Sequence, residues 1–143
     1  NNMKIFKLML VSVVASLISF SAMAHDPKGE SFTLSGKVTS VELTDGGGVI
    51  TVSAEAGRYG KVFLTYNVKL NPSLPNQGYF SGRGIGIDDE GNREAGSRQG
   101  VFRREGSIMN FYSLDDVSDG RLNYCETVIN LRTDEVEMTF YPF

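Results

Sequence analysis

The sequence has a single cysteine, a single histidine and no tryptophan among its 143 residues. Cys125 has no partner for a disulfide within the chain, so we expect a buried structural thiol, with an intermolecular bridge or a reactive thiol as the alternatives. Because His25 is the only histidine, the sequence excludes Ser–His and Cys–His nucleophile pairs and multi-histidine zinc or copper centres. Any catalysis must use Asp, Glu, Tyr, Lys, Arg or the shape of a pocket.

Long hydrophobic runs are also absent, apart from one near the start. Lys4 and Lys7 precede an apolar run over residues 8–20, and the small residues Ala22 and Ala24 follow it. This pattern predicts a secretory signal peptide cleaved after Ala24, and the 13-residue run is shorter than the roughly 20 residues of a spanning helix. We therefore expect a secreted or periplasmic protein without a stable membrane anchor, with residues 1–2 as an upstream scar.

Basic residues are too few for nucleic-acid binding. The chain has 14 Lys and Arg against 17 Asp and Glu, and removal of Lys4 and Lys7 leaves 12 basic residues, a net charge of −5 for residues 25–143 with histidine neutral. Binding of nucleic acid needs a clustered basic face that displaces counterions. We expect no nucleic-acid partner and one domain over residues 25–143, a length that buries a single modest core.

The remaining pattern is that of short strands. Apolar residues alternate with polar ones and the segments are separated by Gly, Asp and Asn, with no long stripe of helical period. The clearest alternation places Val62, Leu64, Tyr66 and Val68 on one face. The expected strands are 32–43, 49–56, 59–70, 79–87, 93–104, 107–114, 121–131 and 135–141. Residues 71–77, NPSLPNQ, are expected to form a loop because proline removes a ladder donor.

About eight antiparallel strands with one apolar face each can close into a barrel or split into a sandwich. Most of the connections are of hairpin length, which favours sequential pairing, whereas a Greek-key sandwich needs longer crossings. We therefore predict an all-β, up-and-down antiparallel barrel, with a β-sandwich as the alternative.

Three glycines at a spacing of two, Gly82, Gly84 and Gly86, remove the side chains from one face of a strand. A nucleotide-binding glycine fingerprint needs a different spacing and a following helix, so we exclude it. A bare strand face permits sharp coiling of the sheet, the close approach of another element, or an unfilled lumen. The sequence leaves these explanations open.

The acidic segment 115–126 partly matches a calcium-binding EF-hand loop, with Asp115, Asp119 and Glu126 as the candidate ligands. Position 3 of the loop is Val117, which has no side-chain oxygen, and the preceding residues alternate as a strand does. We expect a turn over residues 115–120 and no bound metal.

The stretch 100–114 is expected to be a hairpin turned at residues 105–106. Phe102 and Arg104 share one face of its first strand and Arg103 lies on the other, so one arginine points inward. The second strand is apolar on both faces, with Tyr112 and Leu114 opposite Phe111. Both faces should therefore be covered, the outer one by a subunit or a terminal segment.

Four stretches, GRYGKVFLTYNVKL (57–70), GYFSGRGIGIDDEG (78–91), GVFRREG (100–106) and LRTDEVEMTFYPF (131–143), resemble bacterial relatives of the allene oxide cyclase barrel family. The resemblance implies an eight-stranded, calycin-like barrel with a small lumen, which often assembles into oligomers, so a homo-oligomer is among the expected partners. Many bacterial members have no assigned activity. No cyclase catalytic residue is carried over, because no motif identifies one.

We expect a secreted barrel that binds a small apolar or amphipathic ligand in its lumen and needs no cofactor. The predicted lumen residues are Tyr66, Arg104, Phe111, Cys125 and Met138, with Tyr66 and Arg104 orienting the ligand. The first alternative is a cyclase or isomerase with Glu126 or Tyr124 as the acid/base. The second is a structural or partner-binding barrel without a ligand.

Overall fold

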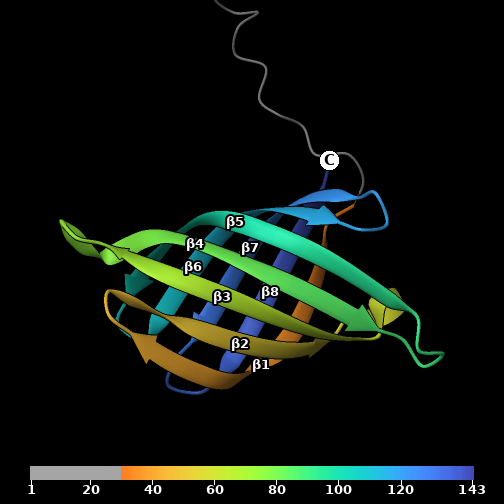
Figure 1. Cartoon of the computed structure of the whole chain (residues 1–143), viewed down its shortest axis with the longest axis horizontal. Coiled ribbons are helices and arrows are strands. Elements are labelled where there is room, and N and C mark those ends of the chain that lie inside the picture. Colours follow the sequence, from red (N-terminus) through yellow and green to blue (C-terminus); the bar gives the residue numbers. More distant parts are fainter. Residues whose placement is uncertain (1–29) are drawn as a thin grey trace, which may run out of the picture.

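The computed structural model describes residues 30–143, which form a closed barrel of eight antiparallel strands (Figure 1). The strands are β1 (Phe32–Thr44), β2 (Gly47–Glu55), β3 (Lys61–Asn71), β4 (Leu74–Ile87), β5 (Arg93–Glu105), β6 (Ile108–Val117), β7 (Leu122–Asn130) and β8 (Glu135–Pro142), with a short 3-10 helix, η1 (Gly57–Tyr59), between β2 and β3. Each strand pairs with its neighbours in sequence, and β8 pairs with β1. The predicted all-β, up-and-down barrel is confirmed, and the sandwich alternative is wrong.

The first 29 residues lie outside the described part of the chain, and with them the predicted signal peptide and His25. Cleavage after Ala24 and export therefore stay predictions. Within residues 30–143, no helix has the length and apolar character needed to cross a membrane.

The alternation of residues along each strand determines what fills the barrel. In β3, Val62, Leu64, Tyr66 and Val68 are buried, while the residues between them face outward. The ring closes where β1 meets β8, with Phe32 opposite Phe140 and their rings stacked at a centroid distance of 4.9 Å. Since the barrel has no free edge, all eight strands contribute one face to a common core.

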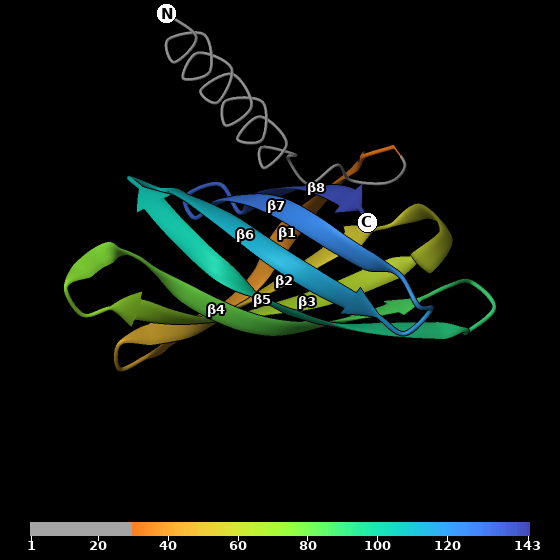
Figure 2. The ribbon, with the colours of Figure 1, turned by 90° about the horizontal axis from the view of Figure 1, so that it is seen from above.

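The expected loop over residues 71–77 is wrong. Pro72 and Ser73 alone make the turn, Asn71 pairs with Leu74, and the amide of Ser73 donates to Oδ1 of Asn71 at 2.9 Å. Pro75 lies in an interruption of the β3–β4 ladder, where no partner requires its missing N–H. The β3–β4 hairpin therefore continues past the body of the barrel (Figure 2).

The expected turn at residues 115–120 begins too early, because β6 continues to Val117. Asp115 is buried and faces the lumen, opposite Asn123 of β7. A charged residue can occupy this inner position because Arg98 of β5 neutralises it. The turn is confined to residues 118–121, where Gly120 has a positive φ of 91°.

Candidate site: a cavity at one end of the barrel

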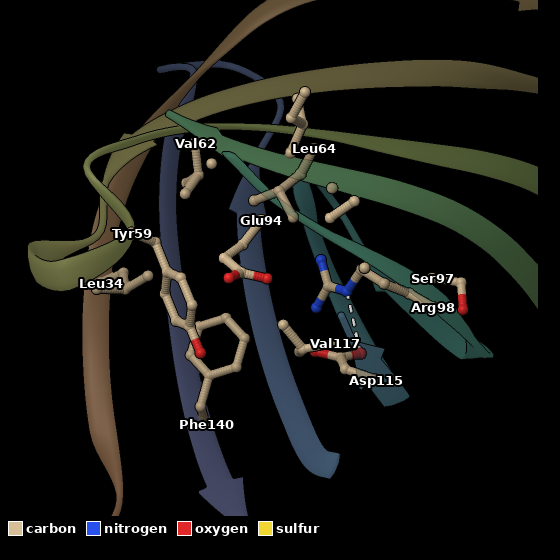
Figure 3. A pocket seen from close by; sticks show the side chains of 15 residues that line it. Leu34, Tyr59, Val62, Leu64, Glu94, Ser97, Arg98, Asp115, Val117 and Phe140 are labelled. Carbon is tan, nitrogen blue, oxygen red and sulfur yellow. Dashed lines mark hydrogen bonds and ion pairs between the residues drawn. The ribbon is translucent and has the colours of Figure 1, made fainter. Parts of the chain in front are cut away.

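A cavity of about 90 Å³ opens at the end of the barrel that carries η1, the β4–β5 loop and the β6–β7 turn (Figure 3). Its wall is mainly apolar and comes from six strands. The apolar lining comprises Leu34, Val62, Leu64, Ile85, Val117 and Phe140. Tyr59 of η1 stands at the mouth, and Arg98 and Asp115 lie at its inner end. The cavity therefore combines an apolar wall with a few polar groups, as small-ligand sites usually do.

Glycines on two paired strands leave this space empty. Gly84 of β4 lies opposite Gly96 of β5, and both line the cavity together with Gly86. A Cβ atom at Gly84 would meet only the end of the flexible Leu64 side chain, at 2.8 Å from Cδ2. The open-lumen explanation of the glycine stripe therefore holds at Gly84.

Gly82 has a different role, although it belongs to the same stripe. A Cβ atom there would overlap the backbone carbonyl oxygen of Thr65 on β3. At this point the Thr65 hydroxyl accepts a hydrogen bond from the Arg83 amide at 3.1 Å, which brings a side chain into the β3–β4 ladder. Gly82 thus permits the sheet to coil sharply, so the stripe serves both purposes.

A buried ion pair forms the inner end of the cavity. Nε of Arg98 lies 3.1 Å from Oδ1 of Asp115, Nη2 donates to Ser113 Oγ at 3.2 Å, and Nη1 donates to the Tyr66 hydroxyl at 2.8 Å. Burial alone would lower the pKa of Arg98, but attraction to Tyr66 and Asp115 outweighs it and raises the pKa above its ordinary value. The guanidinium therefore stays charged, and its hydrogen bonds satisfy it although it is buried.

Beyond this ion pair the barrel is filled by side chains. Four aromatic rings pack together, with Tyr66 at 4.8 Å and Phe80 at 5.0 Å from the ring of Phe111, and Phe102 at 5.6 Å from the same ring. The Tyr66 hydroxyl also bonds to Thr127 at 3.1 Å. Because side chains fill this half of the barrel, a ligand can enter only the cavity at the end that carries η1.

Four of the five predicted lumen residues do point inward but lie in the packed half. Tyr66, Phe111, Cys125 and Met138 are all at most 1 % exposed, and none of them lines the cavity. Burial raises the pKa of the Cys125 thiol to about 11, so the thiol is protonated and unreactive at neutral pH. These side chains are core residues that support the site from beneath.

The inward placement of Arg104 is wrong. It shares a face with Phe102 as expected, but it lies one residue before the end of β5, beyond the point where the lumen is enclosed. Its side chain is exposed and donates to the Gly106 carbonyl at 2.9 Å and to Oδ1 of Asn76 at 2.7 Å. The inward arginine of this strand is Arg98, six residues earlier on the same face.

The two candidate acid/base residues lie on the outer face of β7. Tyr124 and Glu126 alternate with the inward residues Asn123 and Cys125, and the Tyr124 hydroxyl donates to Oε1 of Glu126 at 3.0 Å. Partial burial and this neighbouring carboxylate raise the pKa of Tyr124 to about 12. Neither residue lines the cavity, so a reaction of a ligand held there would not use them.

The three candidate calcium ligands do not converge. Asp115 faces the lumen, Asp119 lies in the β6–β7 turn beside Arg58, and Glu126 is on the outer face. In the part of the chain that the structure describes, no group of three His, Cys, Asp or Glu side chains could hold a metal ion. Strand alternation explains the separation, because β6 continues through residues that an EF-hand would use as its loop.

Charged side chains hold the mouth of the cavity in place. The Tyr59 hydroxyl donates to Oδ2 of Asp119 at 2.7 Å, and Nη2 of Arg58 donates to the same oxygen at 2.6 Å. The β4–β5 side of the mouth is tied to the β6–β7 turn, because the Ser118 hydroxyl donates to Oε2 of Glu94. Tyr59 of η1 and Glu94 of β5 therefore both lie at the entrance (Figure 3).

Sequence reasoning missed Arg98, Tyr59 and Glu94. Arg98 stands between Ser97 and Gln99 in a polar stretch, and only its spacing of four from Phe102 places it on the inner face. Tyr59 was expected at the start of a strand, whereas it belongs to η1. The available signal was Gly57 and Gly60 on either side of it, both with positive φ, which interrupt the strand pattern.

The outer face of β6 is apolar, as expected, and it is not covered within residues 30–143. Tyr112 is 40 % exposed and Leu114 55 % exposed, and Val101 on the paired strand β5 is 56 % exposed. The expectation that a subunit or a terminal segment covers this face stays a prediction.

The fold and the cavity together define an up-and-down barrel that is packed in one half and open at one end. Comparison of the chain with protein-family models, with curated proteins and with solved structures found no match. The resemblance to the allene oxide cyclase barrel family therefore stays a prediction that rests on the residue pattern.

Proposed function

We propose that this chain is a binding protein that takes a small apolar or amphipathic group into the end cavity, and that it works outside the cytoplasm after removal of the predicted signal peptide. One observation supports this best: an open, apolar space kept empty by paired glycines above a fully satisfied ion pair. A barrel that served only as a rigid body would gain stability by filling this space with side chains.

The size of the cavity limits what it binds. An apolar cavity of about 150 Å³ holds benzene, so a space of about 90 Å³ accepts the end of a short alkyl chain or part of a ring. Burial of about four carbon groups at about 0.8 kcal/mol each, with further contact at the mouth, corresponds to a dissociation constant of about 1 mM. Tighter binding requires polar contacts between the rest of the ligand and the mouth.

The enzyme alternative, a cyclase or isomerase that holds a reactive ligand, has less support. Its expected acid/base residues, Tyr124 and Glu126, lie outside the barrel. The groups that do line the cavity, Arg98 and Asp115, already satisfy one another and neighbouring side chains. An acid or base in the cavity would have to be Glu94 or Tyr59, and both hold the mouth in place.

Titration of ¹⁵N-labelled protein with 1-pentanol tests the proposal. We expect saturable shifts of the backbone amide signals of Gly84, Gly86 and Gly96, because these residues line the cavity. Gly84→Val places a side chain in the cavity and should abolish the shifts at Gly86 and Gly96. Ser81→Val, on the outer face of the same strand, is the matched control and should bind as the unchanged protein does. If the folded protein shows no saturable shift at these glycines, the proposed function is wrong.

A further inference from the structure

The carboxylate of Glu94 is a half-buried anion in the wall of the cavity. Glu94 is the second residue of β5 and lies opposite Gly86, where Tyr59 packs so closely that a Cβ atom would lie 2.7 Å from the Tyr59 carbonyl oxygen. Figure 3 shows its carboxylate directed into the cavity, between the side chains of Tyr59 and Arg98. Its hydrogen bond from Ser118 fixes the carboxylate group but brings no positive charge.

The arginines near Glu94 are engaged elsewhere. Arg98 is paired with Asp115, and its guanidinium also serves Ser113 and Tyr66. Arg58 and Arg121 both approach Asp119, at 2.6 Å and 3.8 Å. Within residues 30–143, no Lys or Arg nitrogen lies within ion-pair distance of Glu94.

The carboxylate of Asp88 also lies at the mouth and adds a second negative charge near Glu94. Asp88 lies beside Glu94, Arg58 and Asp119 in the outer part of the entrance, and its carboxylate accepts hydrogen bonds from the amides of Glu90 and Asn92 at 3.0 Å and 2.8 Å. The Arg98–Asp115 pair is neutral, and Arg58 and Arg121 together with Asp119 carry one positive charge, so with Glu94 and Asp88 the cavity and its mouth keep a net charge of −1. An anionic ligand would meet repulsion there, and a cation would meet attraction that partial burial strengthens.

We infer that the ligand of the end cavity is a small organic cation with an apolar end, whose ammonium group binds beside Glu94 while its hydrocarbon part fills the space under Tyr59. This inference rests on the proposed function. The apolar wall suits the hydrocarbon part of such a molecule. One face of the Tyr59 ring already lies under the Arg58 guanidinium, 4.8 Å from its centroid, so the attraction for the ammonium group comes from Glu94.

A matched series with one chain length and three head groups tests the charge: n-pentylamine, 1-pentanol and pentanoate at pH 7, followed by the amide signals of Gly86 and Gly96. We expect the amine to bind about fivefold or more tightly than the alcohol, and pentanoate more weakly than either, as one partly buried ion pair predicts. Added salt should reduce the preference for the amine and leave the alcohol unaffected.

Glu94→Gln tests which group is responsible. The glutamine keeps an oxygen that accepts from Ser118, so we expect the amine-to-alcohol ratio to fall to about one, the value without a head-group charge interaction. Glu137→Gln, an exposed carboxylate on the outer face of β8, is the control and should leave the ratio unchanged.

The outcomes separate the two proposals. If none of the three probes binds, the proposed function fails. If all three bind equally well, or if the carboxylate binds best, the cavity is a ligand site but the inference about a cation is wrong. If the amine is preferred and Glu94→Gln keeps that preference, Glu94 is not the group that recognises it and the inference is again overturned.

Discussion

The guanidinium of Arg98 donates from Nη1 to the hydroxyl of Tyr66 at 2.8 Å, and this bond joins the cavity to the packed half of the barrel. Arg98 comes from β5 and Tyr66 from β3, and Tyr66 continues the connection to Thr127 of β7 at 3.1 Å. The same guanidinium also lies over the Tyr66 ring, 5.0 Å from its centroid. A polar network therefore crosses the interior and fixes the inner end of the cavity.

Arg98→Met should destabilise the protein strongly. The substitution leaves Asp115 buried without its cation, and loss of one partner from a buried pair costs about 3–5 kcal/mol. Arg104→Met on the same strand is the control, and since Arg104 is exposed it should cost less than about 1 kcal/mol. Urea unfolding followed by circular dichroism measures both. A loss below about 1 kcal/mol for Arg98→Met would show that the ion pair contributes little.

Gly82→Ala and Gly84→Ala should separate the two roles of the glycine stripe. The new Cβ atom at Gly82 overlaps the Thr65 carbonyl, so Gly82→Ala should cost several kcal/mol, about 3 or more, through a displaced backbone. At Gly84 the side chain of Leu64 can move aside, so stability should change by about 1 kcal/mol or less while 1-pentanol binds more weakly. Thermal unfolding and the amide titration report the two effects, and equal stability losses would refute the distinction.

The protein should become less stable between about pH 9 and pH 11. Burial raises the pKa of Cys125 to about 11 from an ordinary value of 9.0, so over this range the unfolded thiol loses its proton while the folded thiol keeps it. The unfolded state then binds fewer protons, and stability falls as pH rises, by roughly 3 kcal/mol at most for this group. Burial raises the pKa of Tyr66 as well, which extends the loss above pH 10.

The urea midpoint measured at pH 8, 9.5 and 10.5 checks this pH dependence, since the difference should appear only above the unfolded thiol pKa. Cys125→Ala removes the thiol and should make the curve flatter below pH 10. A midpoint that does not change up to pH 10.5 would contradict the burial of an ionisable thiol in the folded barrel.

Met138→Ala should affect folding and leave the cavity intact. Met138 is fully buried and its sulfur lies 3.6 Å from the Tyr66 hydroxyl, so truncation should cost about 2–5 kcal/mol. Because Met138 does not line the cavity, the dissociation constant for 1-pentanol should stay within about twofold of that of the unchanged protein. If a folded Met138→Ala variant changes the dissociation constant by more than this, Met138 belongs to the ligand site.

Much of the architecture follows from the sequence, because the alternation of apolar and polar residues along a strand indicates which side chains face inward. The alternation of Val62, Leu64 and Tyr66 correctly predicts the inner face of β3, and short connections correctly predict sequential pairing. Pro75 misled the prediction because proline was assumed to end pairing, whereas a local interruption of the ladder accommodates it.

The candidate site was less predictable, for a geometric reason. Period two places Arg104 on the inner face, but it does not say where along a strand the lumen ends. Likewise Gly82 and Gly84 look alike in sequence, but a Cβ atom at Gly82 would overlap the Thr65 backbone, whereas one at Gly84 would meet a flexible Leu64 side chain. Both properties depend on the three-dimensional placement of each strand against its neighbours around the barrel, which a single sequence does not specify.

The pairing of Phe32 with Phe140 also governs when this chain can fold during its synthesis. β1 is made first and its second partner is made last, so the ring cannot close until β8 has left the ribosome. Until then β1 and the newest strand each present an unpaired backbone edge, and contacts between distant parts of a chain form slowly. The barrel can therefore close only after β8 has been made, and β1 keeps one unpaired backbone edge until then.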